Sequence, residues 1–352
     1  MFVPVVDHDQ QPLMPTTPAR ARRWIRGGKA TAFWKGGLFC VRLNVEPSAR
    51  EIQPVACGID PGSKKEGLVV ASAAHTYLNL QADAVTWVKD AEAQSTRMRR
   101  TRRNRKTPCR QPRANRRQSK KKLPPSTKAR WQWKLRLARF LCRLFPISVF
   151  VVEDVAASTK KGKKRWNRSF SPLQVGKHWF YEEIRQLAPL QLLRGYETEA
   201  LREQLGLKKT RKKMAEVWEA HAVDAWCLAH SAVGGKGAPD NRRLVCVSPF
   251  QWHRRQLHRL EPERGGKRKP YGGTLSLGIK RGTLVKHPKW GLAYVGGTMD
   301  GRISLHDPRT GKRLTQTAKG ADCRRLALRR WRTRLLPLCP TSTKGTPASS
   351  PD

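Results

Sequence analysis

The stretch VACGIDPGSKKEGLVVAS, residues 55–72, places a single carboxylate, Asp60, at the end of an apolar run and directly before a turn. The residues before Asp60 predict a buried strand, and Pro61-Gly62 is a dipeptide typical of tight turns. The apolar run 68–71 predicts a returning strand. A charge at such a position either caps the turn or belongs to a functional site. This stretch alone is compatible with both.

Positive charge dominates the composition of the chain. Its 352 residues include 72 Lys and Arg against 26 Asp and Glu, a formal net charge of +46. Such a surface repels itself and predicts a polyanionic partner, of which nucleic acid is the usual one. No apolar run approaches the ~18 residues that a membrane-spanning helix needs, and no signal-peptide pattern precedes Asp7. We therefore expect a soluble, cytoplasmic nucleic-acid-binding protein with no membrane partner.

The run STRMRRTRRNRKTPCRQPRANRRQSKKK, residues 95–122, contains no acidic residue. Its residue types allow a helix as far as Lys106, and Pro108 and Pro112 interrupt it. A helix with arginine on every face has nothing to bury, so phosphates must surround it. The alternative is a disordered basic segment, but the run lies between two core-forming segments, which favours an ordered helix embedded in nucleic acid. Candidate contacts are Arg97, Arg99, Arg100, Arg102, Arg103, Arg105, Arg110, Arg113, Arg116 and Arg117.

The remaining elements are predicted from hydrophobic periodicity. An amphipathic helix is expected over 130–145, and the run ISVFVVEDVAA, residues 147–157, predicts a central strand with Glu153 at its end. A basic loop follows, in which Trp166 and Phe170 either stack on bases or pack beneath the loop. The later predictions are helices over 173–187 and 211–230, a strand near 190–198, and, from residue 244, a small antiparallel β module.

Three carboxylates stand out by their positions. Asp60 and Glu153 each end a buried strand, and Asp224 lies in AHAVDAWCLA, a helical segment that is apolar on nearly every side. Burial of an unpaired carboxylate costs several kcal/mol, so Asp224 needs a cation nearby. A lone helical Asp is usually a cap or a solvated residue. Together, however, the three acids match a phosphodiester nuclease that holds two Mg²⁺ ions. His221, on the helical face of Asp224, would position or deprotonate the attacking water.

These segments resemble the motifs of RuvC-type, RNase H-like nucleases. GIDPGSKKEG is similar to the first motif, VVEDVAA to the second and EAHAVDAWCLA to the third. The arginine-rich run resembles the bridge helix of RNA-guided effectors related to type II CRISPR nucleases. QPLMPTTPARARRWIRGGKA, residues 11–30, resembles the PLMP module of the transposon-encoded IscB and IsrB proteins. The resemblance covers about residues 1–245.

Motifs that are missing from the sequence indicate which branch of these RNA-guided nucleases the chain resembles. An HNH nuclease needs at least two histidines, and His178 is the only one between Glu153 and His221. The eight cysteines form no CxxC pair, so the zinc ribbon of the TnpB-like relatives is missing too. We expect reduced, mostly buried thiols. The chain thus resembles the IsrB family, which has one nuclease site.

That resemblance implies a split RNase H-like α/β fold with a mixed sheet and flanking helices. It also implies an omega RNA whose guide pairs with one strand of target double-stranded DNA, while the RuvC site nicks the other. Asp60, Glu153 and Asp224 match the family's metal ligands and His221 its third-motif histidine. A monomeric ribonucleoprotein, nucleoid-associated when bound to DNA, is expected. The implied parts are a PLMP-like module (1–52), RuvC-I (53–90), the bridge helix (91–122), RuvC-II with its connecting segment (123–209), RuvC-III (210–243), a target-adjacent-motif-interacting β module (244–339) and a disordered tail (340–352).

Two other functions are compatible with parts of the sequence. The same carboxylates would serve an unguided RuvC-like nuclease specific for branched DNA, although the arginine helix and the terminal modules would then have no role. A non-catalytic RNA-guided DNA-binding protein is the second alternative. All four candidate catalytic positions carry functional residue types, which argues against it.

Overall fold

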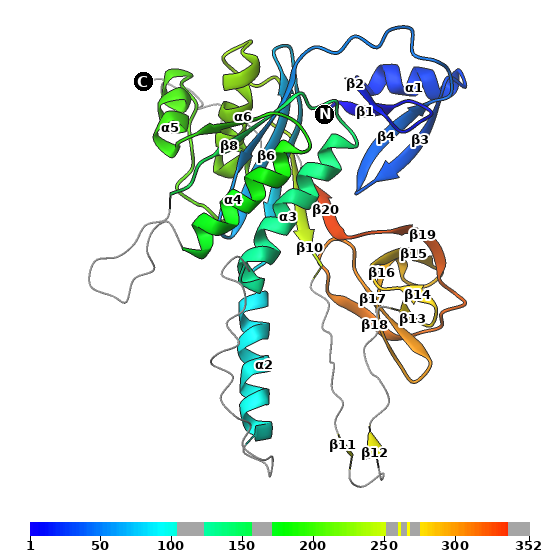
Figure 1. The fold of residues 1–352 in the computed structure, drawn as a ribbon. Helices are drawn as coiled ribbons and strands as arrows, with labels where there is room; N and C mark the ends of the chain where they lie inside the picture. Colours follow the sequence, from blue (N-terminus) through cyan, green and yellow to red (C-terminus); the bar gives the residue numbers. More distant parts are fainter. Residues whose placement is uncertain (104–122, 157–170, 251–259, 262–265, 268–274, 337–352) are drawn as a thin grey trace, which may run out of the picture.

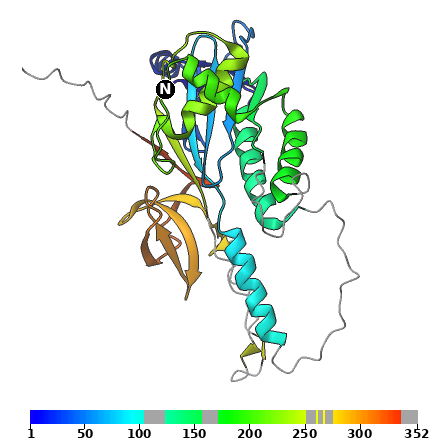
Figure 2. The same cartoon turned by 90° about the vertical axis from the view of Figure 1, so that its left-hand side faces the viewer.

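The computed structural model describes residues 1–103, 123–156, 171–250, 260–261, 266–267 and 275–336. Figure 1 shows a small N-terminal β module, a central sheet with helices on both faces, and a C-terminal β module. A single long helix, α2, extends away from all three, and Figure 2 shows the same projection from the side.

The central sheet of seven strands is the largest sheet in the described part of the chain. In the described part of the chain its strand order is β20-β10-β7-β6-β5-β8-β9. β5, β6 and β7 form an antiparallel meander, β8 and β9 run parallel to β5, and β10 runs parallel to β7. The predicted α/β fold with a mixed sheet is confirmed. The strands are β5 (Val55–Asp60), β6 (Lys65–Ser72), β7 (Thr76–Asp83), β8 (Val149–Glu153), β9 (Leu190–Leu193), β10 (Leu244–Pro249) and β20 (Trp331–Leu335).

Helices cover both faces of this sheet. On one face α3 (Pro125–Cys142) and α4 (Pro172–Arg185) pack on the sheet through a large core that includes Ile59, Leu68 and Phe180. The apolar side predicted for α3 is buried there. On the other face α6 (Trp218–Val233) packs against smaller residues, among them Ala56 and Val69. α5 (Gly195–Gln204) lies beside α6.

Two glycines let the backbone of α6 approach the sheet closely. A Cβ added to Gly58 would lie 1.9 Å from the carbonyl oxygen of Ala225, and one added to Gly67 would lie 2.1 Å from that of His221. Both distances are far below van der Waals contact, so any side chain at either position would push α6 away. The glycines therefore fix the height of α6 above β5 and β6.

Three local predictions were wrong. The C-terminal β module, expected from residue 244, begins only after β10, because β10 pairs with β7 in the central sheet. The expected strand at 190–198 ends at Leu193, and α5 begins at Gly195. The helix expected over 211–230 begins only at Trp218, after a loop. Residues 211–213 are all cationic, and cations are unfavourable in a first helical turn, where the helix dipole is positive. Glu219, by contrast, lies in the first turn of α6.

The N-terminal module is a four-stranded sheet covered by one helix. Its helix α1 (Pro18–Arg26) begins after Thr17, whose hydroxyl accepts a hydrogen bond from the Arg20 amide, and carries Pro at its first position. Val5, Ala21 and Val41 belong to its separate small core. Its strands are β1 (Val3–Val6), β2 (Pro12–Thr16), β3 (Ala30–Lys35) and β4 (Leu38–Leu43).

The C-terminal β module is inserted between two strands of the central sheet. The chain leaves the sheet after β10, forms a five-stranded antiparallel sheet with its own core, and returns as β20, which pairs antiparallel with β10. β20 also contacts the N-terminal module, because Trp331 Nε1 and Thr333 Oγ1 both donate to the Gly36 carbonyl. The module's strands are β11 (Leu260–Glu261), β12 (Gly266–Lys267), β13 (Leu275–Ser276), β14 (Ile279–Lys280), β15 (Thr283–His287), β16 (Gly291–Met299), β17 (Arg302–His306), β18 (Arg313–Ala318) and β19 (Arg324–Leu328).

The cysteines agree with the prediction where they are described. Cys40, Cys57, Cys227, Cys246 and Cys323 are buried free thiols, and Cys142 is a partly exposed one. Cys109 and Cys339 lie outside the described residues.

Replacing Gly58 with Ala should lower the urea concentration at which the core unfolds. The new methyl group would overlap the Ala225 carbonyl, so we expect a loss of about 3 kcal/mol or more in the free energy of unfolding. Urea unfolding followed by circular dichroism measures it. Gly237→Ala is the control, because its Cβ would meet no atom closer than 3.4 Å. Equal stability of the two variants would contradict the close approach of α6.

Candidate active site

Asp60 and Glu153 lie at neighbouring strand ends. β5 and β8 pair in parallel, with Ile59 opposite Val152. The residues that follow these two, Asp60 on β5 and Glu153 on β8, therefore lie side by side at the ends of their strands. Because side chains alternate along a strand, Asp60 shares the face of Gly58, which is the face that α6 covers.

The helix α6 brings His221 and Asp224 to the same place. His221 Nδ1 lies 3.1 Å from Oδ2 of Asp60. Asp224 follows about one turn later, and its side chain is only 2% exposed. The structure thus gathers the four residues that the sequence singled out, and their catalytic role stays a prediction.

Two cations that the sequence analysis missed bind Asp224. Arg202 Nη1, from α5, lies 2.7 Å from Oδ1, and the ammonium of Lys209 pairs with Oδ2. Asp224 raises the pKa of Lys209 above its usual value, against the lowering effect of burial. These ion pairs give Asp224 the cation that its burial requires. Only the acidity of Asp224 could have hinted at partners, because nothing distinguishes Lys209 from its basic neighbours in sequence.

Of the three carboxylates, Glu153 is the one that forms no ion pair with any described residue. Burial and, to a smaller extent, the negative charges of Asp60 and Asp224 together raise its pKa to about 7. Lys209 and Arg202 oppose this effect only in part. The three acids are therefore close enough to disfavour their joint ionisation, which is the electrostatic environment that a divalent cation relieves.

His221 is held at both ring nitrogens. Its Nε2 lies 2.9 Å from the carbonyl oxygen of Lys213, which can only accept a hydrogen bond, so Nε2 carries a proton. Nδ1 faces the Asp60 carboxylate, which also accepts. Burial lowers the pKa of His221, but Asp60 outweighs it and leaves the pKa raised. In this arrangement His221 orients Asp60, and both of its ring nitrogens already face hydrogen-bond acceptors of the protein.

Asp154, next to Glu153, is directed elsewhere. Its Oδ1 accepts hydrogen bonds from the Lys177 ammonium at 2.6 Å and from the Tyr181 hydroxyl at 3.0 Å, both on α4. These contacts anchor the chain directly after β8 and neutralise Asp154. Glu153 alone of the two acids faces the charges of Asp60 and Asp224.

The donor chemistry suits a hard divalent cation. Asp60, Glu153 and Asp224 supply carboxylate oxygens, the ligands that Mg²⁺ and Mn²⁺ prefer. Within the described ranges no three His, Cys, Asp or Glu side chains already form a metal-ligand cluster. The reason is visible in the contacts: His221, Arg202 and Lys209 take up carboxylate oxygens that a metal would share. The residues fit such ions once Lys209 gives up its contact.

The candidate nucleic-acid residues are only partly described. Arg97, Arg99 and Arg100 are exposed on α2 (Val88–Arg103), the projecting helix in Figure 1. Arg102 and Arg103 end this helix. Arg105, Arg110, Arg113, Arg116, Arg117, Trp166 and Phe170 lie outside the described residues.

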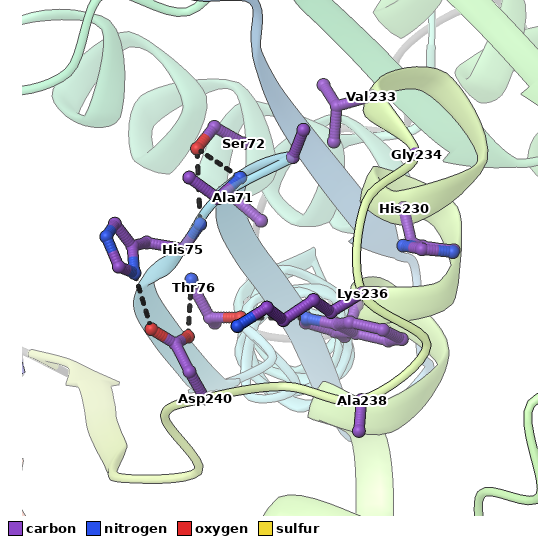
Figure 3. Close-up of a pocket in the computed structure, with 13 residues that line it drawn as sticks. Ala71, Ser72, His75, Thr76, His230, Val233, Gly234, Lys236, Ala238 and Asp240 are labelled. Carbon is purple, nitrogen blue, oxygen red and sulfur yellow. Dashed lines mark hydrogen bonds and ion pairs between the residues drawn. The ribbon is translucent and has the colours of Figure 1, made fainter.

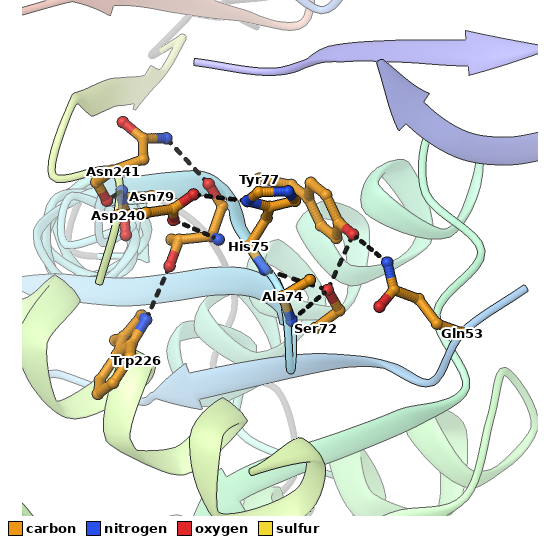
Figure 4. A network of polar contacts seen from close by, with 10 residues as sticks. Gln53, Ser72, Ala74, His75, Tyr77, Asn79, Trp226, Asp240 and Asn241 are labelled. Carbon is orange, nitrogen blue, oxygen red and sulfur yellow. Dashed lines mark hydrogen bonds and ion pairs between the residues drawn. The ribbon is translucent and has the colours of Figure 1, made fainter. Parts of the chain in front are cut away.

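A cavity lies at the far end of α6 from the carboxylates. It has a volume of about 90 Å³ and is lined by Trp226, His230 and Lys236 among others (Figure 3). Beside it Asp240 binds His75 Nδ1 and the Thr76 amide, and Trp226 Nε1 donates to the Thr76 hydroxyl (Figure 4). These contacts fasten the β6–β7 turn to α6. Structural bracing explains them without a ligand.

Comparison with known proteins bears on the N-terminal half. Residues 3–169 match the family model described as RRXRR protein. No curated protein matches the chain. Among solved structures it is similar to one described as T. thermophilus RuvC in complex with Holliday junction substrate, with 12% identity and a TM-score of 0.29. That match covers 52% of this chain and 97% of the other.

No helix in the described residues is both long and apolar enough to cross a membrane.

Glu153→Gln should stabilise the metal-free protein, and only at high pH. The pKa of Glu153 is raised from about 4.5 in the unfolded chain to about 7 in the folded protein. Ionisation of Glu153 therefore does not reduce the free energy of unfolding below pH 4.5. It reduces that free energy progressively as the pH rises from 4.5 through 7. We expect the variant to exceed wild type by about 2 kcal/mol at pH 8 and to equal it near pH 4.5. Urea unfolding in EDTA across this range measures it. The exposed Glu182→Gln is the control, and parallel curves for wild type and Glu153→Gln would contradict the raised pKa.

Lys209→Ala should bind Mn²⁺ more tightly than wild type, by about tenfold, because an ammonium that competes for Asp224 is gone. Electron paramagnetic resonance of free Mn²⁺, without nucleic acid, measures the affinity. Lys208→Ala removes an equal charge from the same loop at an exposed position and should change little. If Lys209→Ala binds Mn²⁺ no better than Lys208→Ala does, Lys209 is not a competitor.

Proposed function

We propose that this protein is an RNA-guided DNA endonuclease that nicks one strand of its target. The observation that carries the proposal is the convergence of Asp60, Glu153 and Asp224, from two parallel strand ends and one helix, with His221 bound to Asp60. The match of residues 3–169 to the RRXRR model and the RNase H-like sheet support it.

The three carboxylates would hold two Mg²⁺ ions, which supply an activated water and stabilise the leaving oxygen of the phosphodiester. The remaining work falls to the chain's own residues. His221 keeps Asp60 oriented through the Lys213 carbonyl. Arg202 holds Asp224 on its buried side. Lys209, partly exposed, can turn from Asp224 to a phosphate oxygen when DNA arrives.

The guide is proposed from the charge and the resemblance together. A net charge of +46 exceeds what a short DNA contact requires, and an RNA-guided nuclease needs a cationic channel more than base-reading side chains. We propose an omega RNA of the IsrB type as the partner, with α2 as the bridge helix and the C-terminal β module next to a short motif beside the target. The particle would be a monomeric ribonucleoprotein.

The test is a cleavage assay on protein purified with its RNA. Duplex DNA matching the guide, labelled on each strand separately, is incubated with Mg²⁺ or EDTA. We expect a Mg²⁺-dependent nick confined to the non-target strand. Asp60→Ala should lower the rate by at least about a thousandfold, because a ligand of the reacting centre is lost. Asp154→Asn is a matched control, since Asp154 binds Lys177 and Tyr181 instead.

Other outcomes decide between the alternatives. Cleavage of four-way junctions by RNA-free protein would favour an unguided RuvC-like nuclease. Guided binding without cutting, by wild type and Asp60→Ala alike, would favour a non-catalytic RNA-guided DNA-binding protein.

A further inference from the structure

A cavity of about 660 Å³ opens directly beside Glu153. Three elements enclose it: the end of β8 and the residues after it, one side of α4, and the start of α5. Its volume lies within the ~300–1,000 Å³ typical of ligand sites. The lining residues are Glu153, Asp154, Val155, Ala156, Gln174, Lys177, Arg194, Gly195 and Tyr196.

The α5 wall of the cavity carries a cation and an exposed ring. Tyr196 is 63% exposed. Arg194 is exposed as well and forms no salt bridge within the described part of the chain. An exposed tyrosine ring beside an unpaired guanidinium matches a nucleotide, since bases stack on aromatic rings and arginine binds phosphate in a bidentate manner.

The opposite wall is rigid and close to neutral. Lys177 is buried and bound to Asp154 at 2.6 Å, and Gln174 Nε2 lies 3.0 Å from His178 Nε2. Because Lys177 already neutralises Asp154, this acid does not repel a phosphate entering the cavity. The preference for an anion therefore comes from Arg194.

Gly195 sets the distance between the cavity and the carboxylates. A Cβ on Gly195 would lie 3.0 Å from Oε1 of Glu153, so the start of α5 touches the acid that faces the reacting centre. A group bound against Arg194 and Tyr196 is therefore directly next to a phosphate bound at Glu153.

We propose that this cavity binds one unpaired nucleotide of the DNA strand to be cut, with its base on Tyr196 and its phosphate on Arg194. The inference rests on the proposed function and sharpens it. A paired base keeps its stacking neighbours and cannot cover the ring, so the cavity selects a strand that is already displaced from its duplex.

The experiment is photocrosslinking of DNA that carries 5-iodouracil, a base that crosslinks to aromatic side chains on which it stacks. Single-stranded oligodeoxynucleotides are bound to the full-length Asp60→Ala protein, irradiated, and mapped by peptide mass spectrometry. We expect a crosslink at Tyr196 that Tyr196→Phe retains and Tyr196→Ala loses. Affinity for the single strand should fall about 5- to 100-fold in Tyr196→Ala and less than about twofold in Tyr196→Phe. Trp34→Ala removes an equally exposed ring, 61% exposed and in the N-terminal module, and should leave the Tyr196 crosslink unchanged.

Three results would overturn the inference. They are crosslinks elsewhere with Tyr196 unmodified, equal crosslinking of fully paired duplex, and preferential crosslinking of RNA of the same sequence. Binding here requires neither metal nor cleavage. If Tyr196 crosslinks but wild-type protein never cuts, the cavity assignment stands and the nuclease proposal fails. If the wild-type protein cuts DNA but Tyr196 does not crosslink, the nuclease proposal stands and the cavity assignment fails.

Discussion

The structure depends on the backbone of α6 lying almost against the backbones of β5 and β6. Gly58 and Gly67 make this possible, because a Cβ at either would fall about 2 Å from a carbonyl oxygen of the helix. Asp60 follows Gly58 by two residues and pairs with Gly67 across the strands. The glycines that admit the helix thus lie next to the carboxylate, so helix height and site geometry are set by the same contact.

This close packing gathers negative charge that the protein must balance. His221 faces Asp60, Arg202 and Lys209 bind Asp224, and Glu153 is left with a pKa raised by burial and by the other two acids. At neutral pH the ionised carboxylate of Glu153, which the proposed chemistry needs, destabilises the folded protein. Such conflicts between local stability and function are typical of active sites.

Residue patterns in the sequence predicted much of the central sheet and of the carboxylate site. The apolar runs ending in Asp60 and Glu153 indicated strands, and an aspartate in an apolar helix indicated a buried charge that needs a partner. The identity of that partner was out of reach, because Lys209 looks like its neighbours and only the folded loop brings it to Asp224. Arg202 was missed because the segment before it was predicted as a strand. The late start of α6 reflects three consecutive cations that a helix N-terminus disfavours, a local effect that hydrophobic periodicity does not register.

The return of β20 to the central sheet affects how the protein is made. Five strands of that sheet are complete by Leu193, but the edge of β10 is covered only by Trp331–Leu335. During synthesis, therefore, residues 250–330 emerge from the ribosome while β10 still presents an open edge, and open edges invite pairing with other chains. A nascent chain of this kind gains from an early partner that shields it. Under the proposed function that partner is the RNA, which the net charge of +46 would attract, and assembly with RNA and folding would then be steps of one process.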